Sequence, residues 1–201
     1  MKALVVCEYS QVVTNALRVK GVDAYSNDIL PTEGDSSYHI QCDVRELLRS
    51  DFIKTIDLLI AHDPCTVQCN SGVRWLINKN GVINQERYAE LVKSCELTRE
   101  ILNAPVDKIC RENPIPHKYA LQLIRVKYSQ IIQPHYFNGS VESKATCLWL
   151  KNLPPLLYSH QVDKSLIKQS VWKMPPGINR GLERSRFPLA IAEAMATQWT
   201  I

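Results

Sequence analysis

The stretch Asp57-Leu58-Leu59-Ile60-Ala61-His62-Asp63-Pro64-Cys65 decides the fold of this 201-residue chain. Its apolar part, residues 57–61, is short and continuous, which is typical of a strand buried on both faces of a parallel sheet. Polar residues and a thiol follow directly where the apolar run stops. Six further short segments are predicted to be strands: residues 3–7, 23–26, 39–42, 108–110, 130–133 and 146–150.

Predicted helices lie between these strands. The clearest covers residues 85–102, where apolar side chains broadly share one face. Others are expected at 11–20, 43–50, 117–125 and 187–199, the last rich in alanine. Strands alternate with helices over the first 125 residues, and this pattern predicts an α/β fold with a doubly wound, mostly parallel sheet.

The composition excludes several classes of protein. Hydrophobic residues make up 45% and charged residues 22%, as in ordinary globular proteins. No apolar run approaches the ~20 residues of a membrane span, so we expect no membrane partner. Seven cysteines without paired spacing predict free thiols in a reducing, cytoplasmic compartment, and no metal site. The length suits a single domain over 1–201, with an irregular segment at 151–186 and a closing helix at 187–199.

Polar residues gather where the predicted strands end. In doubly wound sheets, ligands bind beyond the carboxyl ends of the strands, so these residues are expected to meet on one rim. The motifs are Glu8-Tyr9-Ser10, Asn27-Asp28, Asp43, His62-Asp63-Pro64-Cys65 and Arg111-Glu112-Asn113-Pro114.

The last two of those motifs carry a family resemblance. A strand ending in Pro64-Cys65 and a later one ending in Glu112-Asn113 resemble the Pro-Pro-Cys and Glu-Asn-Val motifs of DNA (cytosine-5) methyltransferases. That likeness covers mainly the first 115 residues and implies a Rossmann-like sheet of the class I methyltransferase type. The whole chain is also similar to small phage and prophage proteins of this kind, which implies a host-cell cytoplasmic location if it is phage-encoded. The shared motifs stand at 8–10, 65–66, 70–75, 112–114, 144–150 and 194–199.

The resemblance implies a catalytic set of Cys65, Glu112 and Asn113. Carbon 5 of a pyrimidine is a poor nucleophile until a thiolate adds to carbon 6, which is the role implied for Cys65. Glu112 would stabilise charge at ring nitrogen 3. Because a free thiol has a pKa of about 8.5, a cation or dipole should assist its ionisation. The sequence leaves Arg111, Arg74 and His62 open for this part.

The implied cofactor is S-adenosylmethionine. The family binds it through the loop after the first strand and through acids after the second and third strands. Two departures stand out: Gln11 replaces a usual glycine, and Asp63 replaces a proline. A side chain at Gln11 is expected to crowd the cofactor, and the Asp63 carboxylate to raise the pKa of Cys65. The implied cofactor-binding residues are Glu8, Tyr9, Ser10, Asp28, Asp43, His62, Asp63 and Pro64.

The implied partner is DNA or a pyrimidine nucleotide. The net charge of +4 is compatible with a polyanion. No separate target-recognition domain is expected, which leaves residues 66–84 and 151–186 to contact the substrate. Trp75 and Trp149 are interpreted as core or loop anchors rather than base-stacking platforms. The candidate substrate-binding residues are Asn70, Ser71, Arg74, Lys144, Arg184 and Arg186.

Three functions therefore stay open. The first is methyl transfer to cytosine through a Cys65 adduct. The second is a catalytically altered phage protein that binds a nucleotide, a cofactor or a host protein, which the Gln11 and Asp63 departures favour. The third is another pyrimidine modification through the same adduct.

Overall fold

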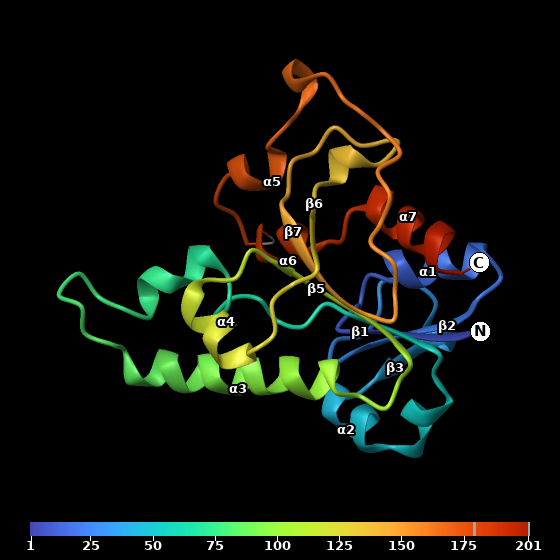
Figure 1. The fold of residues 1–201 in the computed structure, drawn as a ribbon, viewed down its shortest axis with the longest axis horizontal. Coiled ribbons are helices and arrows are strands. Elements are labelled where there is room, and N and C mark those ends of the chain that lie inside the picture. Colours follow the sequence, from blue (N-terminus) through green and yellow to red (C-terminus); the bar gives the residue numbers. More distant parts are fainter. Residues whose placement is uncertain (179, 201) are drawn as a thin grey trace.

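The computed structural model describes residues 1–178 and 180–200 and builds them around one seven-stranded sheet (Figure 1). The strand order is β3-β2-β1-β4-β5-β7-β6. Only β7 runs against its neighbours, β5 and β6. The predicted α/β fold with a Rossmann-like, mostly parallel sheet is confirmed. The strands are β1 Lys2–Val6, β2 Asp23–Asp28, β3 His39–Gln41, β4 Leu58–Ala61, β5 Lys108–Pro114, β6 Gln130–Ile132 and β7 Thr146–Lys151.

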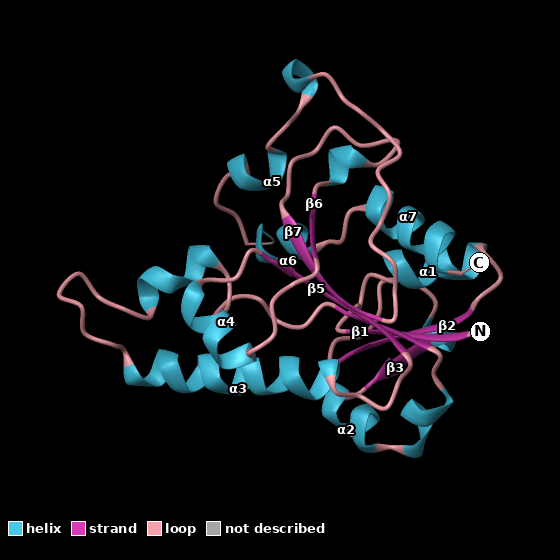
Figure 2. Cartoon of the chain, viewed as in Figure 1, coloured by secondary structure: helices cyan, strands magenta, loops and turns pink. Residues whose placement is uncertain are grey.

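Helices cover both faces of this sheet (Figure 2). α1 and α7 pack on one face, where Val5 and Ile60 point. α2 and the end of α3 pack on the other face, against Leu4 and Leu59. Side chains along β1 and β4 thus alternate between two apolar cores, as a strand requires. The helices are α1 Val12–Val19, α2 Val44–Arg49, α3 Gln85–Leu102, α4 Lys118–Ile124, α5 Ser170–Lys173, α6 Arg180–Ser185 and α7 Leu189–Trp199.

The two long connections, 66–84 and 151–186, each contain short helical turns. Residues 66–84 contain a 3-10 turn, Asn70–Trp75, and form a loop that extends beyond α3 and α4 (Figure 1). The segment predicted to be irregular, 151–186, holds the short helices α5 and α6. In the part of the chain that the structure describes, no helix is long and apolar enough to cross a membrane.

Candidate functional site

A cavity of about 310 Å³ opens at the carboxyl ends of β1, β2 and β4. The strand order reverses between β1 and β4, which is the point where doubly wound sheets bind ligands. The volume lies at the small end of the range for ligand sites. Its lining residues are Cys7, Glu8, Tyr9, Ser10, Asp28, Leu30, His62, Pro64, Gly181, Ser185, Arg186 and Phe187.

Most of the cofactor-binding residues proposed from sequence lie on this wall, but two do not. Asp43 caps α2 by accepting from the Arg45 N–H at 2.9 Å and stays outside the cavity. Asp63 is buried and turns to the opposite face of the sheet. Phe187 was missed because its segment follows a long irregular stretch. The residues that do line the cavity are Glu8, Tyr9, Ser10, Asp28, His62 and Pro64.

Glu8 has a structural task within that wall. Its carboxylate accepts from the Val13 N–H at 2.5 Å, the Thr14 N–H at 3.2 Å and the Thr14 hydroxyl at 2.7 Å. Burial raises the pKa of Glu8, while the charge of His62 and these hydrogen bonds oppose that shift. Both carboxylate oxygens of Glu8 therefore accept hydrogen bonds from the first turn of α1 and stabilise the start of that helix.

Gln11 does not crowd the cavity, so that expectation is wrong. Its backbone is left-handed, with φ of 56°, a conformation that glycine adopts without strain. The side chain turns away and bonds to Ser26 Oγ at 3.0 Å and to the Asp35 backbone at 2.8 and 2.9 Å. Gly34 leaves the necessary room, because a Cβ there would stand 2.1 Å from the Gln11 oxygen.

Two buried polar atoms on the cavity wall have no hydrogen-bond partner. They are the Tyr9 hydroxyl and His62 Nε2. An unpaired buried polar group costs about 1–3 kcal/mol, so both atoms favour a polar ligand at this place. Asp28 adds a half-buried carboxylate, of which one oxygen accepts the Leu30 N–H at 2.9 Å. The wall therefore fits a ligand that carries hydroxyl or amino groups.

His62 joins this cavity to Glu112. His62 Nδ1 lies 3.0 Å from Glu112 Oε2, and the two side chains are only 11% and 10% exposed. The Phe187 ring packs on His62 with centroids 4.6 Å apart. Burial alone would raise the pKa of Glu112, but the His62 hydrogen bond and the charges of His62, Lys144 and Arg111 hold it below its usual value. Glu112 is therefore a carboxylate held by a histidine.

Cys65 lies half-buried on the turn that follows β4. A hydrogen bond with Cys69, burial, and the nearby charges of Cys69 and Glu112 raise the pKa of Cys65, and only Lys144 opposes them. The cation at this thiol is thus Lys144, whose ammonium also donates to the carbonyls of Arg184 and Arg186 at 3.1 Å. The sequence had left Arg111, Arg74 and His62 open for this part, and Lys144 is none of these. Arg74 instead lies over the Trp75 ring, 4.8 Å from its centroid.

Asp63 and Arg111 form a buried, two-pronged ion pair. Arg111 Nε lies 2.6 Å from Asp63 Oδ1, and Nη2 lies 3.0 Å from Oδ2. Thr98 on α3 donates to the same carboxylate at 2.7 Å, and Gln68 accepts from Arg111 at 2.6 Å. The groups that chiefly shift the pKa of Cys65 are Cys69, Glu112 and Lys144 rather than Asp63, whose charge is balanced by Arg111. Instead, the pair anchors the Cys65 turn to β5 and α3.

The alternation of strands could have revealed this arrangement from sequence. His62 and Asp63 follow each other, so they must point to opposite faces of the sheet. Asn113 is fully buried, and its side-chain amide lies beside Asp63 and Arg111.

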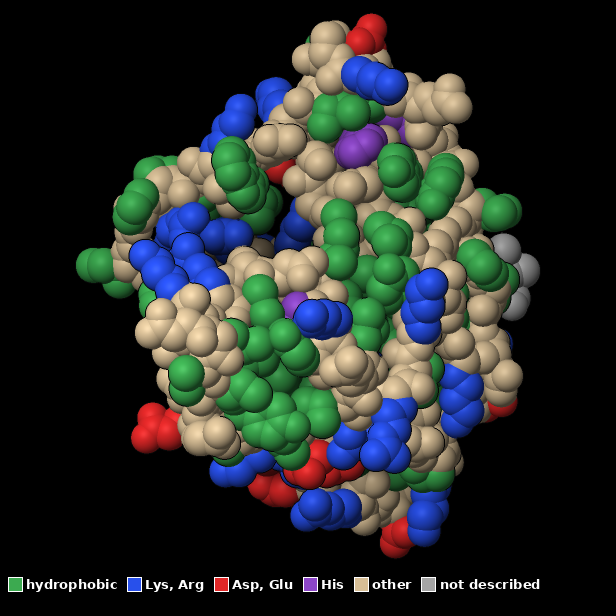
Figure 3. Space-filling view, turned by 60° about the vertical axis from the view of Figure 1, so that its left-hand side comes forward, with side chains coloured by type: hydrophobic (Ala, Val, Ile, Leu, Met, Phe, Trp, Pro, Cys, Tyr) green, Lys and Arg blue, Asp and Glu red, His purple; other side chains and the backbone are tan. Residues whose placement is uncertain are grey.

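The substrate residues proposed from sequence divide between two places: Lys144 lies near Cys65, whereas Arg186 lines the cofactor cavity. Asn70, Ser71 and Arg74 are on the 3-10 turn, and Ser71 Oγ is 3.0 Å from Cys69 Sγ. Arg186 pairs with Glu33 at 2.9 Å. Figure 3 turns the side of the molecule that carries the 66–84 loop toward the viewer and shows Lys and Arg side chains gathered beside a hollow.

The two tryptophans behave differently. Trp149 is 1% exposed and donates to the Val126 carbonyl at 2.9 Å, as expected of a core anchor. Trp75 is 61% exposed, so its interpretation as an anchor is wrong. An exposed indole beside Arg74 is a surface on which a planar ring can stack.

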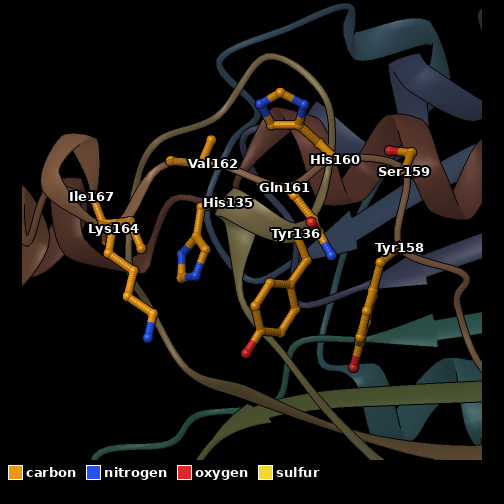
Figure 4. Close-up of a pocket in the computed structure, with 9 residues that line it drawn as sticks. All are labelled: His135, Tyr136, Tyr158, Ser159, His160, Gln161, Val162, Lys164 and Ile167. Carbon is orange, nitrogen blue, oxygen red and sulfur yellow. The ribbon is translucent and has the colours of Figure 1, made fainter.

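A larger cavity of about 700 Å³ lies beyond β6 (Figure 4). Its wall includes Tyr136 and Tyr158, with ring centroids 4.6 Å apart, and also His135 and Lys164. None of its lining residues belongs to the catalytic or cofactor sets. Among the described residues, no cluster of three or more His, Cys, Asp or Glu side chains is arranged to hold a metal ion.

No known family model matches this chain, and no curated protein does either. Among solved structures, it is similar to a protein described as a DNA modification methyltransferase encoded within a prophage (E. coli), with 17% identity and a TM-score of 0.39 over 75% of this chain and 46% of that one. The Dnmt2 methyltransferase of S. pombe shares 17% identity, with a TM-score of 0.42 over 77% and 51%. A Spodoptera frugiperda DNMT2 mutant shares 16%, with a TM-score of 0.39 over 81% and 53%. The chain thus spans about half the length of each.

Proposed function

We propose that this chain is a methyltransferase that uses S-adenosylmethionine to methylate carbon 5 of a cytosine, in DNA or in a pyrimidine nucleotide. One observation carries the proposal. Cys65 and Glu112 stand at the ends of neighbouring strands, near enough for their charges to interact, beside a cavity with unpaired polar atoms at the switch point of the sheet.

The cofactor would occupy the cavity at β1, β2 and β4, where it supplies an electrophilic methyl group. The Asp28 carboxylate suits the hydroxyls of a ribose. The Tyr9 hydroxyl and His62 Nε2 are left without partners and suit the polar groups of such a ligand. Asp43 and Glu8 are occupied as helix caps, so we assign neither a direct contact.

The catalytic residues divide the work on the pyrimidine. Cys65 adds to carbon 6, and Glu112 faces the nitrogen at which charge develops. His62 holds Glu112 in place through a hydrogen bond from Nδ1. Through the same contact, His62 is positioned to return a proton to the Glu112 carboxylate. Lys144 lies close enough to influence both Cys65 and Glu112 and favours the anionic form of each.

The substrate would approach over the 66–84 loop. A base in a duplex must leave the stack to reach a thiol in such a turn. Arg74 and the exposed Trp75 offer a charge and a ring face for this purpose. The other loop beside the site is 151–186. We expect the two loops to contact mainly phosphates, and because phosphate contacts carry no sequence information, we expect low sequence specificity.

The test is calorimetric titration with S-adenosylmethionine and S-adenosylhomocysteine, followed by transfer of a labelled methyl group to duplex DNA, single-stranded DNA and cytidine nucleotides. We expect micromolar binding, and transfer that Cys65→Ser abolishes. Cys42→Ser, a half-buried thiol outside the cavity, is the control and should remain active. The assignment fails if neither cofactor form binds at millimolar concentration.

A non-catalytic binder is the second candidate, and one observation favours it. The interaction with Cys69, burial and the charge of Glu112 raise the pKa of Cys65, against the charge of Lys144. A protein that binds S-adenosylhomocysteine but methylates none of the three substrates would support this candidate.

A further inference from the structure

The cavity of about 700 Å³ beyond β6 has no part in the methyl-transfer site. Its volume falls within the range of sites for small ligands and is more than twice that of the cofactor cavity. Among the described residues of its wall, none is acidic, two are tyrosines, two are histidines and one is a lysine. Such a wall suits a ligand that carries an aromatic ring and a negative charge.

Two aromatic side chains stand next to each other in this cavity. The ring centroids of Tyr136 and Tyr158 are 4.6 Å apart, and the ring planes are inclined by 43°. Figure 4 shows the two rings side by side, with His135 on the other side of Tyr136. Tyr158 is 54% exposed, and its hydroxyl donates to the Ile131 carbonyl at 3.3 Å. This contact holds the ring in position while much of its surface stays open to a planar ligand.

Backbone hydrogen bonds hold the two walls of the cavity together. The N–H groups of Ser159 and His160 both donate to the Tyr136 carbonyl at 3.1 Å. Farther along the same two segments, the Lys168 N–H donates to the Val141 carbonyl at 2.8 Å. Because these contacts form without a ligand, the cavity is preformed, and binding there costs little further ordering of the chain.

The polar groups of the wall suit a base and a phosphate. His135 Nδ1 lies 3.0 Å from the Glu142 carbonyl oxygen, which can only accept, so Nδ1 carries the proton and Nε2 of the neutral ring can accept from an amino group. Lys164 supplies an ammonium for a phosphate. The adjacent acid, Asp163, accepts from the N–H and the hydroxyl of Ser165 at 2.8 Å. Asp163 therefore caps the turn that begins at Lys164 instead of lining the cavity.

The cavity lies close to the Cys65 site along the chain. The Glu142 carbonyl that holds His135 is two residues before Lys144, and two residues span at most about 7 Å. Lys144 in turn lies near enough to Cys65 and Glu112 for its charge to act on both. A strand with its target base at Cys65 can therefore place a neighbouring nucleotide in the cavity.

We propose that this cavity binds a nucleotide that flanks the target base in single-stranded DNA. The Tyr158 ring stacks on the flanking base, His135 Nε2 accepts from an amino group of that base, and Lys164 faces a phosphate. The proposal deepens the proposed function and rests on it for the target base at Cys65. Base stacking on aromatic rings, combined with cations along the backbone, holds single strands without reading their sequence. This mode of binding agrees with the low sequence specificity expected of the two loops.

The test measures the binding of a fluorescein-labelled, single-stranded pyrimidine oligonucleotide, about 12 nucleotides long, to the full chain by fluorescence anisotropy without cofactor. Tyr158→Ala should weaken binding by about tenfold because the stacking of one base is lost. Tyr158→Phe keeps the ring and should bind like the wild type. Lys164→Gln should reduce the magnitude of the slope of log K against log salt by about 0.7, the value for one phosphate contact on a single strand.

The matched control is Tyr38→Ala. Tyr38 is a half-buried tyrosine directly before β3, at the opposite edge of the sheet from β6. Its removal should leave the affinity for the oligonucleotide unchanged, so an equal loss in Tyr38→Ala and Tyr158→Ala would contradict the assignment of the cavity.

Equal affinity of Tyr158→Ala and the wild type would overturn the proposal. Inorganic polyphosphate that competes as well as the unlabelled oligonucleotide would also overturn it, because the interaction would then depend on charge alone. If Tyr158→Ala does not fold, a 4-thiothymidine oligonucleotide is photo-crosslinked to the wild type and the crosslinks are mapped by peptide mass spectrometry. They should fall in the peptides that contain Tyr136 or Tyr158, and crosslinks confined to 66–84 would refute the proposal.

Failure of this subsite and failure of the proposed function give different results. Binding that depends on Tyr158, without methyl transfer to any substrate, would defeat the proposed function and leave the nucleotide-binding cavity in place. Methyl transfer to single-stranded DNA with the same KM in Tyr158→Ala and in the wild type would defeat the subsite alone.

Discussion

Two polar clusters lie on opposite faces of the sheet at the end of β4, although their central residues are adjacent in sequence. The Asp63 cluster comprises Asp63, Arg111, Gln68, Thr98 and Ser94, and it faces α3. The His62 cluster comprises His62, Glu112, Tyr9 and Asp28, and it faces the segment before α7. Both contain buried acids and bases.

The clusters differ in how completely their polar atoms are paired. In the Asp63 cluster, both carboxylate oxygens are bonded, and the unpaired Arg111 Nη1 belongs to a guanidinium that lies over the Trp149 ring. In the His62 cluster, Tyr9 Oη and His62 Nε2 remain unpaired beside a cavity. Closed pairing indicates a structural task, and open pairing indicates a place for a ligand.

The largest expected effect comes from breaking the closed cluster. Arg111→Met should lower the free energy of unfolding by about 3–5 kcal/mol, because it leaves Asp63 charged and buried without its partner. The double variant Asp63→Leu/Arg111→Met should recover most of that loss. Urea unfolding monitored by circular dichroism measures both.

A matched control is Arg45→Met, whose partner Glu100 is half-exposed. A pair of this kind is worth about 1 kcal/mol or less. Similar losses at Arg45 and Arg111 would contradict the structural assignment of the Asp63 cluster.

Glu112→Gln should have the next largest effect, and this effect depends on pH. The variant should lose about 1.5–3 kcal/mol near pH 7, the usual value for a hydrogen bond to a charged group. Since the folded protein lowers the pKa of Glu112, its stabilisation is complete above the unfolded pKa of about 4.3 and disappears as the pH falls through the folded value. Unfolding curves between pH 3 and 7 should converge for wild type and variant at the acid end.

Glu8 provides a control with the opposite sign. Its pKa is raised in the folded protein, so the wild type should gain stability relative to Glu8→Gln as the pH falls. Parallel pH profiles for the two variants would refute the different environments assigned to these two carboxyl groups.

Thr98→Val should cost less, about 1 kcal/mol, because Asp63 keeps its Arg111 contacts when the Thr98 hydroxyl is lost. The affinity for S-adenosylmethionine should not change, since Thr98 lies on the face away from the cavity. If Thr98→Val lowered the affinity for S-adenosylmethionine, the two clusters would belong to one functional site.

Much of this organisation could be predicted from the sequence, but only where neighbours in the chain decide it. The apolar run of β4 and the helical pattern of 85–102 depend on local periodicity, and both were predicted correctly. Lys144 at Cys65 and Phe187 on His62 join segments far apart in the chain, and no local pattern encodes such contacts. The exposure of Trp75 was predicted wrongly, because the sequence around an indole on a polar loop does not indicate whether the side chain is buried or exposed.

The smallest expected effect tests the open cluster directly. Tyr9→Phe removes a hydroxyl that has no partner in the protein, so the free energy of unfolding should stay the same or rise slightly. If that hydroxyl meets a polar group of the cofactor, the affinity for S-adenosylmethionine should fall by about fivefold to tenfold, as expected for one hydrogen bond of about 1 kcal/mol. Calorimetric titration and urea unfolding of the same preparations separate the two quantities. A variant that loses stability while binding the ligand as tightly as the wild type would place Tyr9 with the closed cluster, because only a group already paired within the fold is missed when no ligand is present.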